Sequence, residues 1–137
     1  MNNQDLVELI NAPDRITALS TAGADGAPNT AIIGSAFMAE KDQLWLGLAD
    51  NRTAKNLAVN PKAVLLVFRP GSTVLDWKGG RLYLELAALE TEGHRFDQMV
   101  DRIRTTAGRM AARAIRQLAI CRIAETRPLA EFGDIKR

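Results

Sequence analysis

The segment Asp50–Leu57, which reads Asp-Asn-Arg-Thr-Ala-Lys-Asn-Leu, holds the residues of this chain best suited to bind a ligand. Two cations, Arg52 and Lys55, and two capping-type polar residues, Asn51 and Thr53, stand where a short helix is predicted to begin. A helix N-terminus already carries about half a positive charge from its free N–H groups, so cations there are mildly unfavourable unless an anion is bound. The segment therefore predicts an anion site, and the obvious anion is a phosphate.

The sequences on either side of this segment support the same interpretation. Leu44–Ala49 has the pattern of a strand that runs into the turn, and Asn60-Pro61 ends the helix. The spacing matches neither a Walker A loop nor a Gly-x-Gly-x-x-Gly turn, so side chains and helix N–H groups would hold the phosphate. A solvated surface turn that binds nothing would explain the same residues.

The elements that must position this segment are mainly strands. Apolar residues at helical spacing predict helices at Asp5–Ile10 and from Gly93 to Gly108, and the tract Arg109–Gln117 continues as a helical turn or two. The first three strands are joined by short turns, as in an antiparallel meander. We therefore expect one domain over residues 1–137, an antiparallel β-barrel with peripheral α-helices. The six predicted strands are Ile16–Thr21, Asn29–Phe37, Leu44–Ala49, Ala63–Phe68, Leu82–Leu89 and Leu118–Ala124.

The overall charge excludes an obvious polyanionic partner. The 137 residues include 18 basic and 16 acidic side chains, a net charge of +2, so we expect neither a nucleic-acid nor a membrane partner. The arginine-rich stretch 102–122 is interpreted as a solvated helix face. The polar N-terminus lacks the pattern of a signal peptide and no apolar run is long enough to span a bilayer, so we expect a cytoplasmic protein.

The single cysteine and the single histidine exclude several kinds of site. Cys121 cannot form an internal disulfide or a cysteine metal cluster, and within an apolar strand it behaves as a small hydrophobe. His94, beside Gly93, is expected to be a capping or surface residue. Hydrolytic triads cannot be assembled around it, so the sequence predicts no catalytic side chain and no metal site.

Beyond these patterns, the chain resembles the FMN-binding split barrel of the pyridoxamine-5′-phosphate-oxidase-like proteins. The resemblance extends over nearly the whole chain and is greatest to the small bacterial FMN-binding proteins, which are single-barrel homodimers with two flavins at the subunit interface. It is carried by Gly23–Gly26 with Pro28, Leu44–Leu46, Asn51–Leu57 with Asn60-Pro61, and Val64–Val67.

The resemblance implies a set of FMN-binding residues. By position, the family's phosphate-binding residues correspond to Arg52 and Thr53. Many relatives have Lys where this chain has Thr53, so Lys55 or Asn51 would share the charge and the hydrogen bonds to the phosphate. Trp77 would cover the flavin of the facing subunit, although an ordinary interface aromatic would look the same. The residues implied to face the ring, with glycines that suit close approach, are Ile32, Ile33, Gly34, Ser35, Gly47, Leu48 and Ala49.

The implied function is that of a flavin-dependent oxidoreductase or electron-transfer protein acting with a small-molecule electron donor or acceptor. The tail Arg127–Gly133 lacks the Arg and Trp pattern of the vitamin B6 enzyme, so pyridoxamine 5′-phosphate is not the expected substrate. Two alternatives stay open: a non-catalytic carrier or sensor of flavin or haem, and a reductase that uses the deazaflavin F420 on the same kind of barrel.

Overall fold

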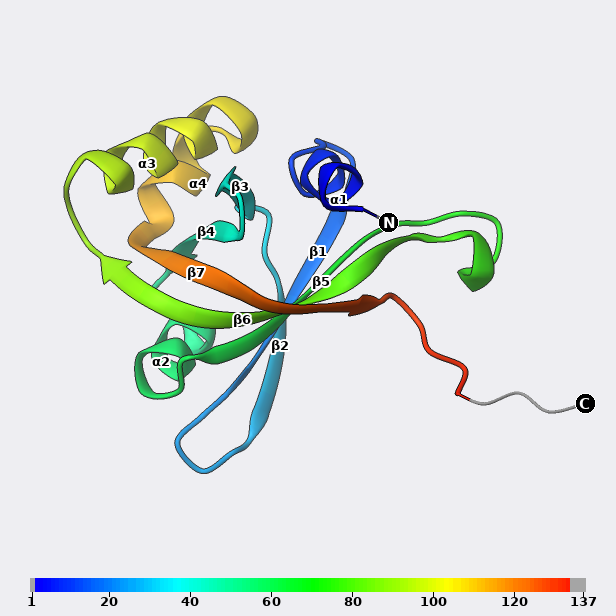
Figure 1. The fold of residues 1–137 in the computed structure, drawn as a ribbon. Coiled ribbons are helices and arrows are strands. Elements are labelled where there is room, and N and C mark those ends of the chain that lie inside the picture. The colour runs from blue at the N-terminus through cyan, green and yellow to red at the C-terminus, as the bar shows by residue number, and fades with distance from the viewer. Residues whose placement is uncertain (1, 134–137) are drawn as a thin grey trace, which may run out of the picture.

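The computed structural model describes residues 2–133, which form one seven-stranded sheet, four α-helices and a short 3-10 helix (Figure 1). The predicted domain also includes residues 1 and 134–137, which lie outside the described residues. In chain order the elements are α1 (Asn3–Ile10), β1 (Ile16–Ala22), β2 (Pro28–Ile32), β3 (Phe37–Glu40), β4 (Gln43–Ala49), α2 (Arg52–Val59), β5 (Lys62–Arg69), η1 (Val74–Asp76), β6 (Lys78–Glu90), α3 (His94–Ala107), α4 (Arg109–Ala114) and β7 (Ile115–Pro128).

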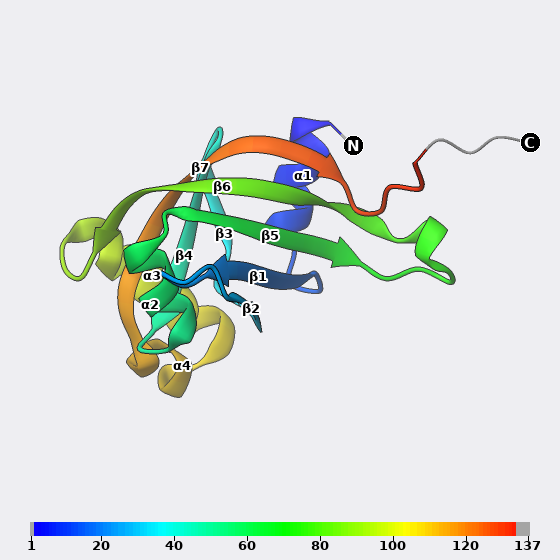
Figure 2. The same ribbon diagram turned by 90° about the horizontal axis from the view of Figure 1, so that it is seen from below.

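The strand order explains why the sheet closes into a barrel. The order is β2-β1-β5-β6-β7-β4-β3, so the two edge strands, β2 and β3, are consecutive in the sequence and are joined by Ile33–Ala36. In a flat sheet six strand spacings of roughly 4.8 Å would separate these edges by about 29 Å, whereas the connection reaches at most about 18 Å. The sheet must therefore curl, and β6 and β7 bend along their length (Figures 1 and 2). The result is a split barrel, as predicted.

Side chains rather than a strand ladder hold the connection Ile33–Ala36, which we call the seam. The Arg15 guanidinium donates from Nη2 to the carbonyl oxygens of Gly34 (2.9 Å) and Ala36 (3.0 Å). The Ser35 hydroxyl donates to the Gly47 carbonyl (2.7 Å) and accepts from the Gly47 N–H (3.0 Å). These bonds satisfy backbone groups that the missing pairing between β2 and β3 would leave open.

The position of the seam shows that two predictions about the strands are wrong. The single strand Asn29–Phe37 is wrong, because β2 leaves its ladder with β1 after Ile32 and β3 begins its ladder with β4 at Phe37. The meander is also wrong, since β2 and β3 lie at opposite edges of the sheet and the strand count rises from six to seven. Gly34 and Ser35 stand at the break, but the apolar residues on both sides of them, Ile32, Ile33, Ala36 and Phe37, favoured one continuous strand. The last two strands are longer than predicted.

The core is divided between the barrel interior and the space under α3. Inside the barrel, α1 contributes Leu9 and Ile10 to a cluster with buried side chains from the strands. Outside it, the predicted apolar stripe of α3 packs on the barrel wall, with Met99 and Ile103 buried against Leu118 of β7. The helix ends at Gly108, whose φ of 96° suits glycine, as the sequence predicted.

Strand β5 differs from its prediction in burial. Its apolar run indicated a strand buried on both faces, but burial alternates along it. Leu65 and Val67 are fully buried in the barrel, whereas Val64, Leu66 and Phe68 on the opposite face are only half-buried. An apolar stripe on the outer face of β5 is therefore partly uncovered in this structure.

The packing of α3 on β4 gives a stability prediction for two glycines. A Cβ on Gly47 would lie 2.7 Å from Ile103 Cδ1 and 3.1 Å from Met99 Cγ, whereas a Cβ on Gly34 meets nothing within 4 Å. We expect Gly47→Ala to lower the free energy of unfolding by about 1–3 kcal/mol through overpacking. The control Gly34→Ala should change it by less than about 0.5 kcal/mol. Urea denaturation of both variants checks this, and equal effects would contradict the packing of α3 on Gly47.

Candidate functional site

The helix start predicted from the sequence is confirmed. Asn51 is the N-cap of α2, with φ −149° and ψ −177°, and its Oδ1 accepts a hydrogen bond from the Ala54 N–H (3.1 Å). The Lys55 N–H donates to the Asn51 carbonyl (3.1 Å). Within residues 2–133 the N–H groups of Arg52 and Thr53 have no partner. Two free donors therefore remain at the positive end of the helix.

The side chains around these donors add positive charge. Arg52 and Lys55 are both exposed, and the first turn of α2 contains no acidic residue. Neither cation forms an ion pair within the part of the chain that the structure describes. Cations at this end of a helix repel its macrodipole, so the local electrostatics favour a bound anion.

Thr53 has a different environment from the one its predicted role requires. Its side chain is 2% exposed, and its Oγ1 accepts a long hydrogen bond of 3.5 Å from Asn29 Nδ2. Asn56, one turn later, is also buried and donates from Nδ2 to Thr21 Oγ1 (3.0 Å). These polar contacts hold α2 on the β1–β2 hairpin. The backbone N–H of Thr53, and not its hydroxyl, is therefore the group left free at the helix start.

A pocket of about 240 Å³ lies beside the start of α2 and contains most of the predicted ring-binding residues. It is bounded by the seam, the end of β4, the α2 N-cap, the C-terminal part of α3, and α4. Eight of the twelve predicted residues line it: Ile32, Ile33, Gly34, Ser35, Gly47, Leu48, Ala49 and Asn51. Arg52, Thr53 and Lys55 continue the chain from Asn51 and are not part of the lining.

The other wall of this pocket was not predicted. It consists of Ile103, Thr106 and Ala107 of α3, Ala111 of α4, and Ile115 at the start of β7. Ile103 belongs to the apolar stripe that the sequence revealed, but a stripe indicates burial and not proximity to a ligand. The other four residues belong to no motif or periodic pattern in the sequence, so sequence analysis could not have identified them.

Some polar groups near the pocket already have hydrogen-bond partners within the protein, and one does not. The Gly47 N–H already has an intramolecular partner, because the Ser35 hydroxyl accepts its hydrogen bond. By contrast, Oε1 of Gln117 is buried without a hydrogen-bond partner among the described residues. Gln117 pairs with Leu48, one of the lining residues, across β4 and β7. A buried unpaired oxygen of this kind is costly unless a ligand or water satisfies it.

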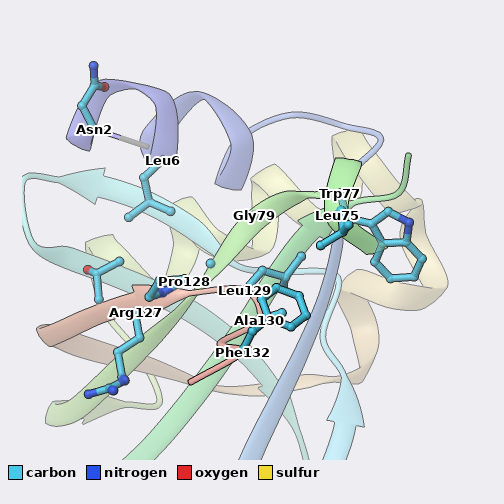
Figure 3. Close-up of a pocket in the computed structure, with 12 residues that line it drawn as sticks. Asn2, Leu6, Leu75, Trp77, Gly79, Arg127, Pro128, Leu129, Ala130 and Phe132 are labelled. Atoms are coloured by element: carbon cyan, nitrogen blue, oxygen red, sulfur yellow. The ribbon is translucent and has the colours of Figure 1, made fainter. Parts of the chain in front are cut away.

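Trp77 does not line this pocket. Its indole stacks on Phe68, with ring centroids 5.1 Å apart and planes 2° from parallel. It lines a different pocket together with Leu75 and Phe132 (Figure 3). Strand β5 separates η1, next to Trp77, from α2 (Figures 1 and 2). Its predicted contact with the flavin of a facing subunit stays a prediction.

The remaining candidate residues have no arrangement for catalysis. His94 is exposed at the start of α3, and Cys121 is 1% exposed in the barrel, where burial raises the pKa of its thiol to about 12. Among residues 2–133 no group of His, Cys, Asp and Glu could hold a metal ion. In the same range, none of the helices has the length and apolar character needed to cross a membrane.

Comparison with known proteins identifies the class to which this fold and site belong. The sequence profile described as pyridoxamine 5′-phosphate oxidase matches residues 3–127, and the chain therefore belongs to that family. A search of curated proteins found no match.

Solved structures share the fold and differ in what they bind. An FMN-binding protein from Syntrophomonas wolfei is 25% identical, with a TM-score of 0.84, and the match covers 94% of this chain and 86% of that protein. An F420 reductase is 12% identical (TM-score 0.69, 92% and 96% covered). HutZ, the haem storage protein from Vibrio cholerae, is 16% identical (TM-score 0.66, 94% and 91% covered). At these identities the last two support the fold alone.

The burial of Cys121 gives a prediction about its reactivity. With a pKa near 12 in place of an ordinary value near 9, its thiolate fraction at pH 8 is about a thousandfold smaller. We expect iodoacetamide to modify the native protein far more slowly than the urea-unfolded protein. The unfolded thiol loses its proton above pH 9 and the folded one does not, so the free energy of unfolding should also fall as pH rises from 9 towards 12. Equal alkylation rates, measured by mass spectrometry, would contradict the burial.

Proposed function

We propose that this protein is a homodimeric FMN-binding flavoprotein that acts as an oxidoreductase or electron-transfer protein. The observation that carries the proposal is the single pocket that collects eight of the predicted residues next to the free N–H groups of α2. Membership of the family supports it, as does the likeness to an FMN-binding protein over most of both chains. When bound, FMN would supply the chemistry by accepting and donating hydride or electrons.

The residues fit the two ends of this cofactor. The N–H groups of Arg52 and Thr53, with the side chains of Arg52 and Lys55, match a dianionic phosphate. Between this point and α3, the seam and Leu48 offer a mixed surface of peptide groups and apolar side chains, which suits a flat ring with polar edges. Ile103 contributes apolar surface that would shield the ring from water.

The size of the pocket supports a dimer. At about 240 Å³ it is smaller than the roughly 300–1,000 Å³ usual for pockets of small ligands. A second subunit would supply the missing wall. Apolar side chains that water now reaches are available for such an interface, because Ile32 at the pocket is 72% exposed and the outer face of β5 is half-buried.

The lining also favours flavin over haem. Protein haem sites bind the iron through His, Cys, Met or Tyr side chains. None of these residue types lines the pocket in the subunit described here, and the single histidine, His94, is exposed at the start of α3. Flavin needs no such ligand. The deazaflavin F420 shares this property, so the lining does not separate it from FMN.

Phosphate binding at α2 gives a quantitative prediction. A charge-assisted contact worth about 1.5–3 kcal/mol corresponds to an affinity change of roughly tenfold or more. We expect Arg52→Ala to weaken FMN binding by more than tenfold in a flavin fluorescence titration. The control is Lys41→Ala, which removes an exposed cation from the β3–β4 turn and should leave the affinity within about twofold. Equal affinities for the two variants would contradict the phosphate assignment.

The identity of the cofactor is tested separately. Protein purified from cells that make both flavins and haem is denatured, and the released chromophore is identified by its mass. We expect FMN. Release of deazaflavin or haem, or purified protein that shows no flavin absorbance even after FMN is added, would contradict the proposed function.

A further inference from the structure

The arginine-rich stretch 102–122 is not the uniformly solvated helix face that the sequence predicted. Arg102 is half-buried, and its guanidinium carbon lies 3.8 Å from the centroid of the Phe37 ring, a cation–π contact. Two exposed arginines form ion pairs, Arg104 with Asp101 (2.6 Å) and Arg122 with Glu85 (2.8 Å). Three more arginines lie between these two, on α4 and at the start of β7, and all three are exposed: Arg109, Arg113 and Arg116.

The positive charge of these three arginines is not offset by any carboxylate nearby. None of them forms an ion pair within residues 2–133. The sequence from 102 to 124 contains neither Asp nor Glu. Nη1 of Arg116 donates to the carbonyl oxygens of Arg113 and Ile115, which fixes the side chain at the end of α4 and leaves its charge free to act outwards.

An exposed methionine lies among these arginines. Met110 is 86% exposed, the highest fraction of any large apolar side chain in the described part of the chain. Because a helix turns about 100° per residue, Arg109 and Arg113 share the outer side of α4 with Met110. Ala111 is half-buried and Ala112 is buried, so they form the inner side. Met and Arg are both enriched in protein interfaces. We call Arg109, Met110, Arg113 and Arg116 the α4 patch.

The α4 patch lies directly outside one wall of the pocket assigned to FMN. Ala111 and Ile115 line that pocket. Arg109 and Arg113 are each two residues from Ala111, about 3 Å along the helix axis, and Arg116 follows Ile115. The turn between α3 and α4 forms an outer edge of the molecule (Figure 2). A molecule bound to the patch would therefore be separated from the flavin by no more than one short helix.

The composition of the patch favours a protein over other anionic partners. Sites for single-stranded nucleic acid combine cations with aromatic side chains, and the patch contains no aromatic residue. Helices that bind anionic lipid need a wide apolar face, whereas α4 has six residues and one large apolar side chain. A second copy of this chain would bring the same arginines together, which like charges oppose. Electron-transfer encounters between proteins are among the smallest interfaces and suit a patch of this size.

We infer that the α4 patch docks the acidic face of a small electron-carrier protein, which exchanges electrons with the flavin. The inference rests on the proposed function, because its meaning comes from the flavin pocket behind α4. Complementary charge would steer the carrier to this edge of the molecule, with Met110 at the centre of the contact. In the reducing direction, two molecules of a one-electron carrier are oxidised for each flavin that gains two electrons, and solvent supplies the protons.

The test measures how fast such a carrier reduces the FMN-loaded protein. The probe is a reduced plant-type [2Fe–2S] ferredoxin, an acidic one-electron carrier, mixed anaerobically with the loaded protein while the flavin absorbance is followed. We expect a second-order rate constant that falls at least tenfold between about 0.01 M and about 0.3 M salt, because salt screens the attraction. A rate constant that does not depend on salt would overturn the inference.

Charge reversal separates the patch from the net charge of the protein. Arg113→Glu should lower the rate constant at low salt by about tenfold or more. The matched control is Lys41→Glu, which changes the net charge equally at the other end of β4, roughly 20 Å away by strand rise. It should leave the rate constant within about twofold. Equal effects of the two reversals would count decisively against docking at α4.

Each variant is checked for an intact flavin site. FMN content is measured by absorbance, and the bound flavin is reduced with photoreduced 5-deazariboflavin, a small uncharged reductant. Both should match the wild type in Arg113→Glu, because no residue of the α4 patch lines the pocket. A wild-type protein that takes up no FMN contradicts the proposed function before any carrier is added. Loaded protein that deazariboflavin reduces and ferredoxin does not would overturn the docking inference alone.

Two further arms address the other anionic partners. Loaded protein is mixed with phosphatidylserine-containing vesicles and, separately, with a short single-stranded DNA, and binding is measured by co-sedimentation and by fluorescence anisotropy. We expect weak binding to both. Tight binding to either that Arg113→Glu abolishes and Lys41→Glu leaves intact would overturn the assignment of the patch to a protein carrier.

Discussion

The short connection between the two edges of the sheet is the constraint on which the rest of the structure depends. Because β2 and β3 are consecutive in the chain but lie at opposite edges of the seven-stranded sheet, the sheet has to curl until four residues can bridge its edges. In the bridge the Ile33 N–H still donates to the Thr17 carbonyl, whereas the Gly34 and Ala36 carbonyls accept from the Arg15 guanidinium. The Ser35 hydroxyl ties the bridge to the backbone of Gly47 in β4. Closure of the barrel thereby creates a polar seam on its surface, and the pocket that we assign to FMN is built against that seam.

Positive charge without local neutralisation is the second feature of the region around this pocket. At the start of α2 the cations accompany free helix N–H groups, and on α4 and β7 three exposed arginines have no carboxylate partner within residues 2–133. Net charge conceals this, since 18 basic and 16 acidic residues nearly balance over the whole chain.

The sequence predicted the local features well and the long-range ones poorly. Asn51 as an N-cap, the stripe of α3 and the stop at Gly108 depend on neighbouring residues, and all were confirmed. The break after Ile32 was missed because it depends on which distant strand each half pairs with, and Gly34-Ser35 alone does not show that pairing. For the same reason Arg102 looked like any other surface arginine. Only the fold places Phe37 beneath it and the seam beside it.

The measurement that tests the central claim most directly is a crystal structure of the protein grown with FMN. The account predicts a dimer in which the phosphate contacts Arg52 at the start of α2 and the ring lies along Ile33–Ser35, facing Ile103. A flavin bound elsewhere, or solvent alone at the start of α2 at saturating FMN, would contradict it.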